Sequence, residues 1–241
     1  MNTIKKSWVL ALLMLIPAMA IASGAGVHLD KAPVDLKDKV SLQRGAKFFT
    51  SNCLACHGAS YMRYNRLKDI GMTDEDIKLL LPEGSKPGST MQAAMDSNSA
   101  KLAFGTAPPD LSVISRSRGP DWIYSFLRSF YVDSKSPSGA DNLVFPKVAM
   151  PNILAGLQGG QELRVENHDG HETKKLALVT PGTMAPAEFD ATVGDLTNYL
   201  VFMGEPARLV RYKIGYIVLG FLAILFVLVY ALKKEIWKDI H

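Results

Sequence analysis

The only two cysteines of the chain lie three positions apart and are followed directly by a histidine, in the order Cys53-Leu-Ala-Cys56-His57. Two thiols at this spacing project from one helical turn and can add to the two vinyl groups of one porphyrin. The histidine then presents a neutral imidazole nitrogen to the iron. The pattern predicts one covalently attached haem c with His57 as an axial ligand. A redox-active dithiol or half of a zinc site would use the same thiols, but neither accounts for the histidine.

An iron that transfers electrons needs a sixth ligand, and a methionine thioether favours its ferrous state. Two methionines lie in proline-flanked loops after the cysteines: Met150 in Val-Ala-Met-Pro-Asn and Met184 in Gly-Thr-Met-Ala-Pro. Spacing alone slightly favours Met184, which comes one short loop before the last helix expected ahead of the C-terminal apolar run. Met203 lies on that helix, where a methionine is expected to be a core residue.

Two apolar runs flank these residues. The first, Trp8–Ala22, follows two lysines and ends in Ala-Ile-Ala, which is typical of a secretory signal peptide over 1–22. The second, Ile214–Leu232, has no charged residue in 19 positions. As a helix it would be about 28 Å long, enough to cross a membrane. We expect an exported domain over 23–207 and a membrane anchor over 208–241, with the span at about 214–232 and a short cytoplasmic tail.

The charges separate along the same boundaries. The chain has a net charge of +4, yet residues 23–207 contain 19 basic and 21 acidic residues. The basic excess therefore belongs to the leader and the anchor region, and nothing supports a nucleic-acid-binding function. Three basic residues lie on each side of the span, so flanking charge does not orient it. The signal peptide does, because it exports the N-terminal side.

The apolar spacing of 23–207 indicates a mostly helical domain with long connections. We expect helices over 39–56 with Ser41 as the N-cap, over 77–81 with a capping motif at Thr73–Asp76, over 120–131 and over 190–203. Residues 84–99 are expected to form a surface loop. A hairpin is expected over 163–179, turning at Asp169-Gly170.

Several short sequences are more specific than the cysteine motif, which by itself indicates only a c-type cytochrome. In chain order they are Arg44-Gly45-Ala46-x-x-Phe49, Tyr64-x-Arg66-Leu67, Pro108-Pro109-Asp110-Leu111-Ser112, Arg116-x-Arg118, Ala149-Met150-Pro151, Asp195-Leu196, Tyr199-Leu200 and Glu205-Pro206. With these motifs and its single C-terminal span, the chain resembles the cytochrome c1 family. This family comprises the haem subunits of quinol–cytochrome c oxidoreductase (bc1) complexes.

The resemblance implies a class I c-type cytochrome domain, mainly α, with long loops, a small hairpin and one C-terminal transmembrane helix. It changes the choice of sixth ligand, because the family's axial methionine lies in the Ala-Met-Pro loop. Met150 is then the expected ligand and Met184 the runner-up. The resemblance also implies that Arg118 pairs with a haem propionate. It further implies that the carbonyl of Pro109, or of Pro108, accepts the Nδ1 proton of His57.

The function implied is one-electron transfer from a Rieske iron–sulfur protein to a soluble or membrane-bound cytochrome c. The chain would not be an enzyme by itself but an electron-transfer subunit that packs on cytochrome b. Its location would be the bacterial inner membrane, with a single span and the haem domain on the periplasmic side. The alternatives are a free-standing membrane-anchored cytochrome that feeds a terminal oxidase, and a haem-based sensor with an open sixth site.

Overall fold

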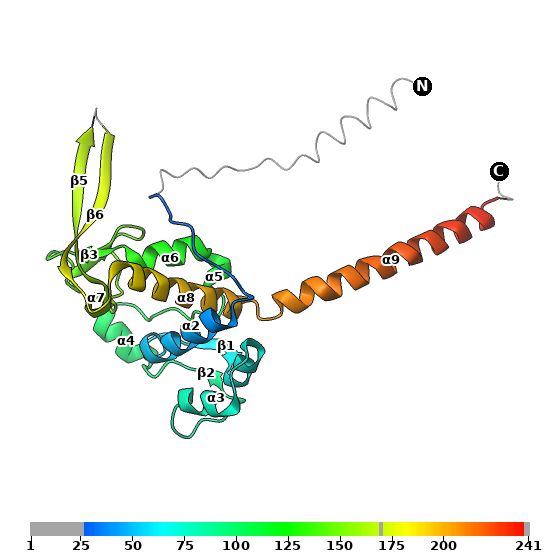
Figure 1. The fold of residues 1–241 in the computed structure, drawn as a ribbon, viewed down its shortest axis with the longest axis horizontal. Helices are drawn as coiled ribbons and strands as arrows, with labels where there is room; N and C mark the ends of the chain where they lie inside the picture. The colour runs from blue at the N-terminus through cyan, green and yellow to red at the C-terminus, as the bar shows by residue number, and fades with distance from the viewer. Residues whose placement is uncertain (1–26, 169–170, 239–241) are drawn as a thin grey trace.

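Helices α2 (Lys39–Asn52) and α8 (Pro186–Gly204) cross at the centre of the head domain (Figure 1). The computed structural model describes residues 27–168 and 171–238, so the predicted signal peptide over 1–22 lies outside it. A Cβ on Gly45 would lie 2.1 Å from the carbonyl oxygen of Asp195 and 2.7 Å from Cβ of Tyr199. The missing side chain therefore lets the two backbones approach closely. Beside this contact, the guanidinium of Arg44 donates to both carboxylate oxygens of Asp195.

Helix α2 begins at Lys39, as expected, but it ends at Asn52 rather than at residue 56 and has a different N-cap. The side chain of Asp38 accepts a hydrogen bond from the backbone nitrogen of Ser41, so Asp38 is the N-cap and the prediction of Ser41 was wrong. An aspartate three residues before a free N–H has the reach and the charge that a helix N-terminus favours. The helix buries Leu42, Ala46 and Phe49 against α8.

Short elements surround the crossing helices. They are β1 (Ala59–Arg63), η1 (Tyr64–Ile70), α3 (Asp74–Leu80), β2 (Thr90–Met91), α4 (Ser97–Phe104), α5 (Ile114–Ser117) and α6 (Pro120–Arg128). The capping motif at Thr73–Asp76 is confirmed as a capping box. The prediction of a surface loop over 84–99 was only partly right, because β2 pairs with β1 and Met91 is fully buried. The Gly, Ser and Pro content of this stretch indicated a loop, although its Met91 side chain belongs to the core.

Strand β3 (Phe130–Val132) pairs antiparallel with β4 (Ala140–Asn142), so the helix expected over 120–131 ends early, at Arg128. After α7 (Ala155–Gln158) come the antiparallel strands β5 (Gly159–His168) and β6 (His171–Pro181). They confirm the predicted hairpin and extend it at its base, whereas its turn at Asp169-Gly170 lies outside the described residues. The hairpin projects from the head beside β3 (Figure 1).

An extended N-terminal segment lies across α6 and α8. The backbone nitrogen of Ala32 donates to Asp121 of α6, and that of Asp35 donates to the side-chain oxygen of Asn198 on α8. Asn198 is almost fully buried and returns a hydrogen bond to the carbonyl oxygen of Asp35. This segment joins two helices that are far apart in the sequence.

The chain ends in α9 (Arg208–Ile236), which leaves the head after α8 stops at Gly204 (Figure 1). Residues Val210–Ile236 are long and apolar enough to cross a membrane, a somewhat longer stretch than the predicted span at 214–232, and none of the most apolar window is buried in the head. The mainly helical head, small hairpin and C-terminal apolar helix confirm the predicted fold class.

Candidate haem site

The cysteine motif forms a turn directly after α2. Cys53 is the C-cap residue of the helix, and its carbonyl oxygen accepts a hydrogen bond of 2.8 Å from the backbone nitrogen of His57. Both cysteines are free thiols, with Cys53 buried and Cys56 partly buried. Burial raises the pKa of the Cys53 thiol to about 12, which keeps it protonated in the folded chain without haem. The turn thus brings two thiols and one imidazole together at the end of a rigid helix.

Two other segments hold this turn through backbone hydrogen bonds. In the first segment, the backbone nitrogens of Ala94 and Met95 donate to the carbonyl oxygens of Leu54 and Ala55, at 3.2 and 3.0 Å. In the second segment, the backbone nitrogen of Leu111 donates to the carbonyl oxygen of Gly58 at 2.8 Å. The motif is therefore held by residues that lie about 40 to 50 positions later.

The imidazole of His57 is buried, and its Nδ1 lies 2.8 Å from the carbonyl oxygen of Pro109. A carbonyl can only accept, so this contact requires a proton on Nδ1 and leaves the lone pair of Nε2 available. Burial lowers the pKa of His57, although the hydrogen bond to Pro109 and the charge of Asp110 oppose the shift. A neutral imidazole with its other nitrogen oriented by a carbonyl is the usual form of a histidine that binds a metal.

Asp110 joins the histidine loop to the proline loop, and sequence reasoning did not single it out. Its two carboxylate oxygens accept hydrogen bonds of 2.8 Å from the backbone nitrogens of Ser60 and Ser112. The hydroxyl of Ser112 accepts in turn from the backbone nitrogen of Tyr61. Burial alone would raise the pKa of Asp110, but the hydrogen bonds from Ser112 and Ser60 outweigh it and lower the pKa. The only feature of the sequence that could have indicated this role is the position of Asp110 directly after Pro109.

The two candidate methionines differ in what surrounds the sulfur. Both Met150 and Met184 are partly buried against the core. The sulfur of Met184 lies 3.8 Å from the hydroxyl oxygen of Thr192 on α8, and its backbone nitrogen donates to the carbonyl oxygen of Leu157. Within the described residues, no hydrogen bond involves the sulfur of Met150. Met184 is thus packed onto α8, whereas the thioether of Met150 has no hydrogen-bond donor among the described residues.

Arg118 follows α5 and is exposed. Its guanidinium carbon lies 5.1 Å from the centre of the Trp122 ring and 5.8 Å from that of the Phe145 ring. Among the described residues, no carboxylate forms an ion pair with it. A guanidinium that rests against aromatic faces keeps its N–H edge free, and this edge matches a carboxylate.

A haem also needs an apolar pocket, and a set of half-buried apolar side chains from separate segments provides candidates. The set comprises Leu111, Ile114, Trp122, Val144, Met150, Leu157 and Met184. These apolar side chains, the two free thiols, the oriented imidazole and the guanidinium of Arg118 are of the kinds that a covalently bound haem requires. The donor set of one imidazole and one thioether suits an iron that cycles between two oxidation states.

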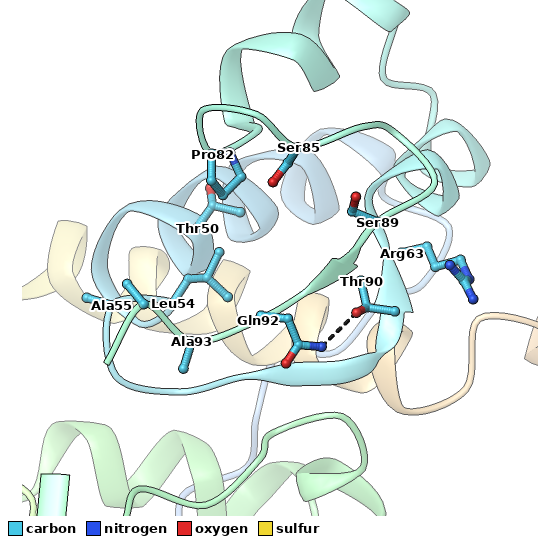
Figure 2. A pocket seen from close by; sticks show the side chains of 11 residues that line it. Thr50, Leu54, Ala55, Arg63, Pro82, Ser85, Ser89, Thr90, Gln92 and Ala93 are labelled. Carbon is cyan, nitrogen blue, oxygen red and sulfur yellow. Dashed lines mark hydrogen bonds between the residues drawn. The ribbon is translucent and has the colours of Figure 1, made fainter. Parts of the chain in front are cut away.

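A groove of about 860 Å³ lies beside the cysteine turn (Figure 2). Thr50, Leu54 and Ala55 form one wall, and residues of the 82–94 segment form the other, including Gln92, which donates to Thr90. Neither cysteine, His57 nor a candidate methionine lines it. The groove borders the cysteine motif only through Leu54 and Ala55.

Comparison with known proteins gives a consistent result over almost the whole chain. The model of the family described as "Cytochrome C1 family" matches residues 30–240. A Nitrosomonas europaea protein named ammonia monooxygenase gamma subunit is 50% identical over 235 residues, which cover 97% of this chain and 98% of that protein. Cytochrome c1 of Allochromatium vinosum is 48% identical over 95% of this chain and 96% of its own length. Cytochrome c1 of Rhodospirillum rubrum is 29% identical over 100% and 99%.

Proposed function

The chain belongs to the cytochrome c1 family, and from this membership we propose that it carries single electrons from a Rieske iron–sulfur protein to a cytochrome c. Members of the family carry a covalently bound haem c and transfer electrons within bc1 complexes, which include cytochrome b and the Rieske protein. The direction of transfer and the identity of the acceptor are part of the proposal. We also propose that this subunit catalyses no reaction by itself.

The proposed site assigns a role to each residue. Cys53 and Cys56 would form the two thioether bonds, and His57 and Met150 would be the axial ligands. When bound, the haem supplies a one-electron couple between ferric and ferrous iron. The carbonyl of Pro109 would hold the Nδ1 proton of His57 and so fix the ring that faces the iron. This assignment rests most directly on the contact of 2.8 Å between Nδ1 and Pro109, beside two free thiols.

Arg118 would bind a haem propionate through the free edge of its guanidinium. The support is that an exposed cation rests on two aromatic rings and forms no ion pair with another described residue. A charge-assisted, bidentate contact would neutralise part of a carboxylate that the apolar pocket would otherwise disfavour.

The proposed organisation is a signal peptide over 1–22, a haem domain over 23–207 and an anchor over 208–241. Helix α9 supports membrane attachment, because it is long and apolar and none of its most apolar window packs on the head. Export by the signal peptide would put the haem domain on the periplasmic side of a bacterial inner membrane. That location is where a Rieske protein and a mobile cytochrome c would meet it.

A tagged chain purified from its native membranes tests this function. We expect co-purification of a cytochrome b and a Rieske protein, and reduction of the c-type haem when a quinol is added. A Rieske-site inhibitor should stop that reduction, and added ferric cytochrome c should reoxidise the haem. Co-purification of an ammonia monooxygenase instead would follow the name of the Nitrosomonas relative and would contradict the proposal. Isolation of the chain without either set of subunits would favour a free-standing cytochrome.

A further inference from the structure

The segment that carries Met150 leaves β4 at Asn142 and has no regular structure before α7. Its middle residues, Phe145, Pro146 and Lys147, are exposed, and Lys147 has a φ of 61°, in the left-handed region that non-glycine residues rarely adopt. Such a segment has no backbone ladder to keep it in one conformation. Side chains at its start supply several of the contacts that hold it.

Asn142 supplies most of these contacts, and its side chain is fully buried. The side-chain oxygen accepts hydrogen bonds from the backbone nitrogens of Val144 and Phe145, at 2.9 and 3.0 Å. The same oxygen accepts from the hydroxyl of Ser129 at 3.1 Å. The side-chain nitrogen donates to the carbonyl oxygen of Phe126 at 2.8 Å. One amide therefore ties the start of the Met150 loop to the last residues of α6.

The preceding residue holds the other end of the loop. The carboxylate of Asp141 accepts a hydrogen bond of 3.2 Å from the backbone nitrogen of Val148, two residues before Met150. Val148 is itself buried. The loop is thus closed on its own first residues, and the backbone hydrogen bond from Leu143 to the carbonyl oxygen of Ser129 fixes the closed unit to the head.

We propose that Asn142 is a positioning residue for the haem: it holds the 143–150 loop closed, so that the thioether of Met150 stays at the iron. The proposal rests on the assignment of Met150 as the sixth ligand. A thioether is a neutral, weak donor, so a loop that opens freely would leave the site to stronger ligands. The fraction of time that the loop is open scales the apparent affinity of any external ligand. Buried hydrogen bonds at the loop's start lower that fraction.

Asn142 also connects the two sides of the site. The backbone nitrogen of Phe145 donates to the side-chain oxygen of Asn142, which fixes Phe145. The ring of Phe145 lies 6.2 Å from that of Trp122 and against the guanidinium of Arg118. Opening of the loop would therefore displace the methionine and remove one of the two rings on which Arg118 rests.

The test uses the haem-loaded ferric protein and titration with imidazole, an external ligand that replaces a thioether. Asn142→Ala should bind imidazole about tenfold more tightly or better than wild type, because several buried hydrogen bonds are lost from the closed state. The thioether-to-iron charge-transfer band should weaken in parallel. Asn198→Ala is the matched control, since Asn198 is also buried and its side chain makes three hydrogen bonds, against four for Asn142, but these hold the N-terminal segment and α2. It should leave imidazole affinity unchanged.

If Asn142→Ala fails to fold, Ser129→Ala decides the question, because it removes one hydrogen bond to the same oxygen and should tighten imidazole binding about threefold. Wild-type affinity in Asn142→Ala, or in Ser129→Ala where that variant decides, would overturn the proposal, as would an equal change in Asn198→Ala. Met150→Ala separates this outcome from a wrong ligand assignment. A charge-transfer band that survives Met150→Ala contradicts the assignment itself, whereas loss of the band there with normal imidazole affinity in Asn142→Ala contradicts only the role of Asn142.

Discussion

The carbonyl oxygen of Pro109 lies 2.8 Å from Nδ1 of His57, a residue 52 positions earlier in the chain. Three further contacts keep the two loops together: the backbone nitrogen of Ser60 donates to the carboxylate of Asp110, that of Tyr61 donates to the hydroxyl of Ser112, and that of Leu111 donates to the carbonyl oxygen of Gly58. The orientation of the imidazole is therefore a property of two loops held in register. It does not follow from the cysteine motif alone.

Replacement of each candidate methionine should distinguish the sixth ligand. Met150→Ala should abolish the thioether-to-iron charge-transfer band and allow the reduced protein to bind carbon monoxide, because the sixth position becomes open. Met184→Ala should keep the charge-transfer band and, like the wild type, should not bind carbon monoxide. It should lose only the packing of its side chain on α8. Absorption spectra of the two purified variants measure this, and the reverse pattern would reassign the ligand to Met184.

The charge of Asp110 should make the stability of the head depend on acid pH. Its folded pKa is lowered, so its contribution is present above the ordinary carboxyl pKa and is lost as the pH falls through the folded value. Asp110→Asn should therefore be less stable than wild type at neutral pH, by less than about 1 kcal/mol because the carboxylate is largely solvated. The gap should begin to narrow below about pH 4, the ordinary carboxyl range, and close as the pH falls through the lowered folded pKa. Thermal unfolding from pH 7 to pH 3 measures it, and a gap independent of pH would be contrary evidence.

Gly45→Ala should destabilise the head strongly. The new Cβ would lie 2.1 Å from the carbonyl oxygen of Asp195, so α2 and α8 must separate. Overpacking of this kind costs roughly 1–3 kcal/mol or more. Gly156→Ala is the control, because its Cβ would meet nothing within 4 Å and its φ is ordinary. Denaturant unfolding of both variants should show a large loss only for Gly45→Ala.

Arg118→Gln should lower the midpoint potential of the haem, by about 40 mV for an electrostatic loss of about 1 kcal/mol. A positive charge near the iron favours the ferrous state, which carries one positive charge fewer. Arg116→Gln is a matched exposed control two residues away. A redox titration checks the pair, and an equal shift in both variants would argue against a specific contact of Arg118 with a propionate.

A chain that ends at Ala207 should be released from the membrane with its haem spectrum intact. None of the most apolar window of α9 packs on the head, and in the part of the chain that the structure describes one ion pair, Arg211 with Glu205, links it to the preceding residues. Fractionation followed by absorption spectroscopy measures both properties. Loss of the thioether band on truncation would mean that α9 supports the site.

The sequence by itself predicted the features that depend on local spacing. Two thiols and a histidine within five residues, 19 successive uncharged positions and the apolar faces of α2, α6 and α8 are patterns of neighbouring residues, and they can be interpreted without the fold. Spacing was less informative at the N-cap of α2, where Asp38 and not Ser41 caps the helix. It was also less informative at Met91, a single core residue in a stretch with the composition of a loop.

Only the tertiary structure decided which distant groups meet. The roles of Asp110, Asn142 and the crossing at Gly45 depend on hydrogen bonds and close approaches to residues that lie in separate elements, and no periodicity in the chain records them. The same holds for the two methionines, whose sequence contexts are alike. They differ in that the sulfur of Met184 lies near the hydroxyl of Thr192 on α8, a contact that depends on how the chain packs.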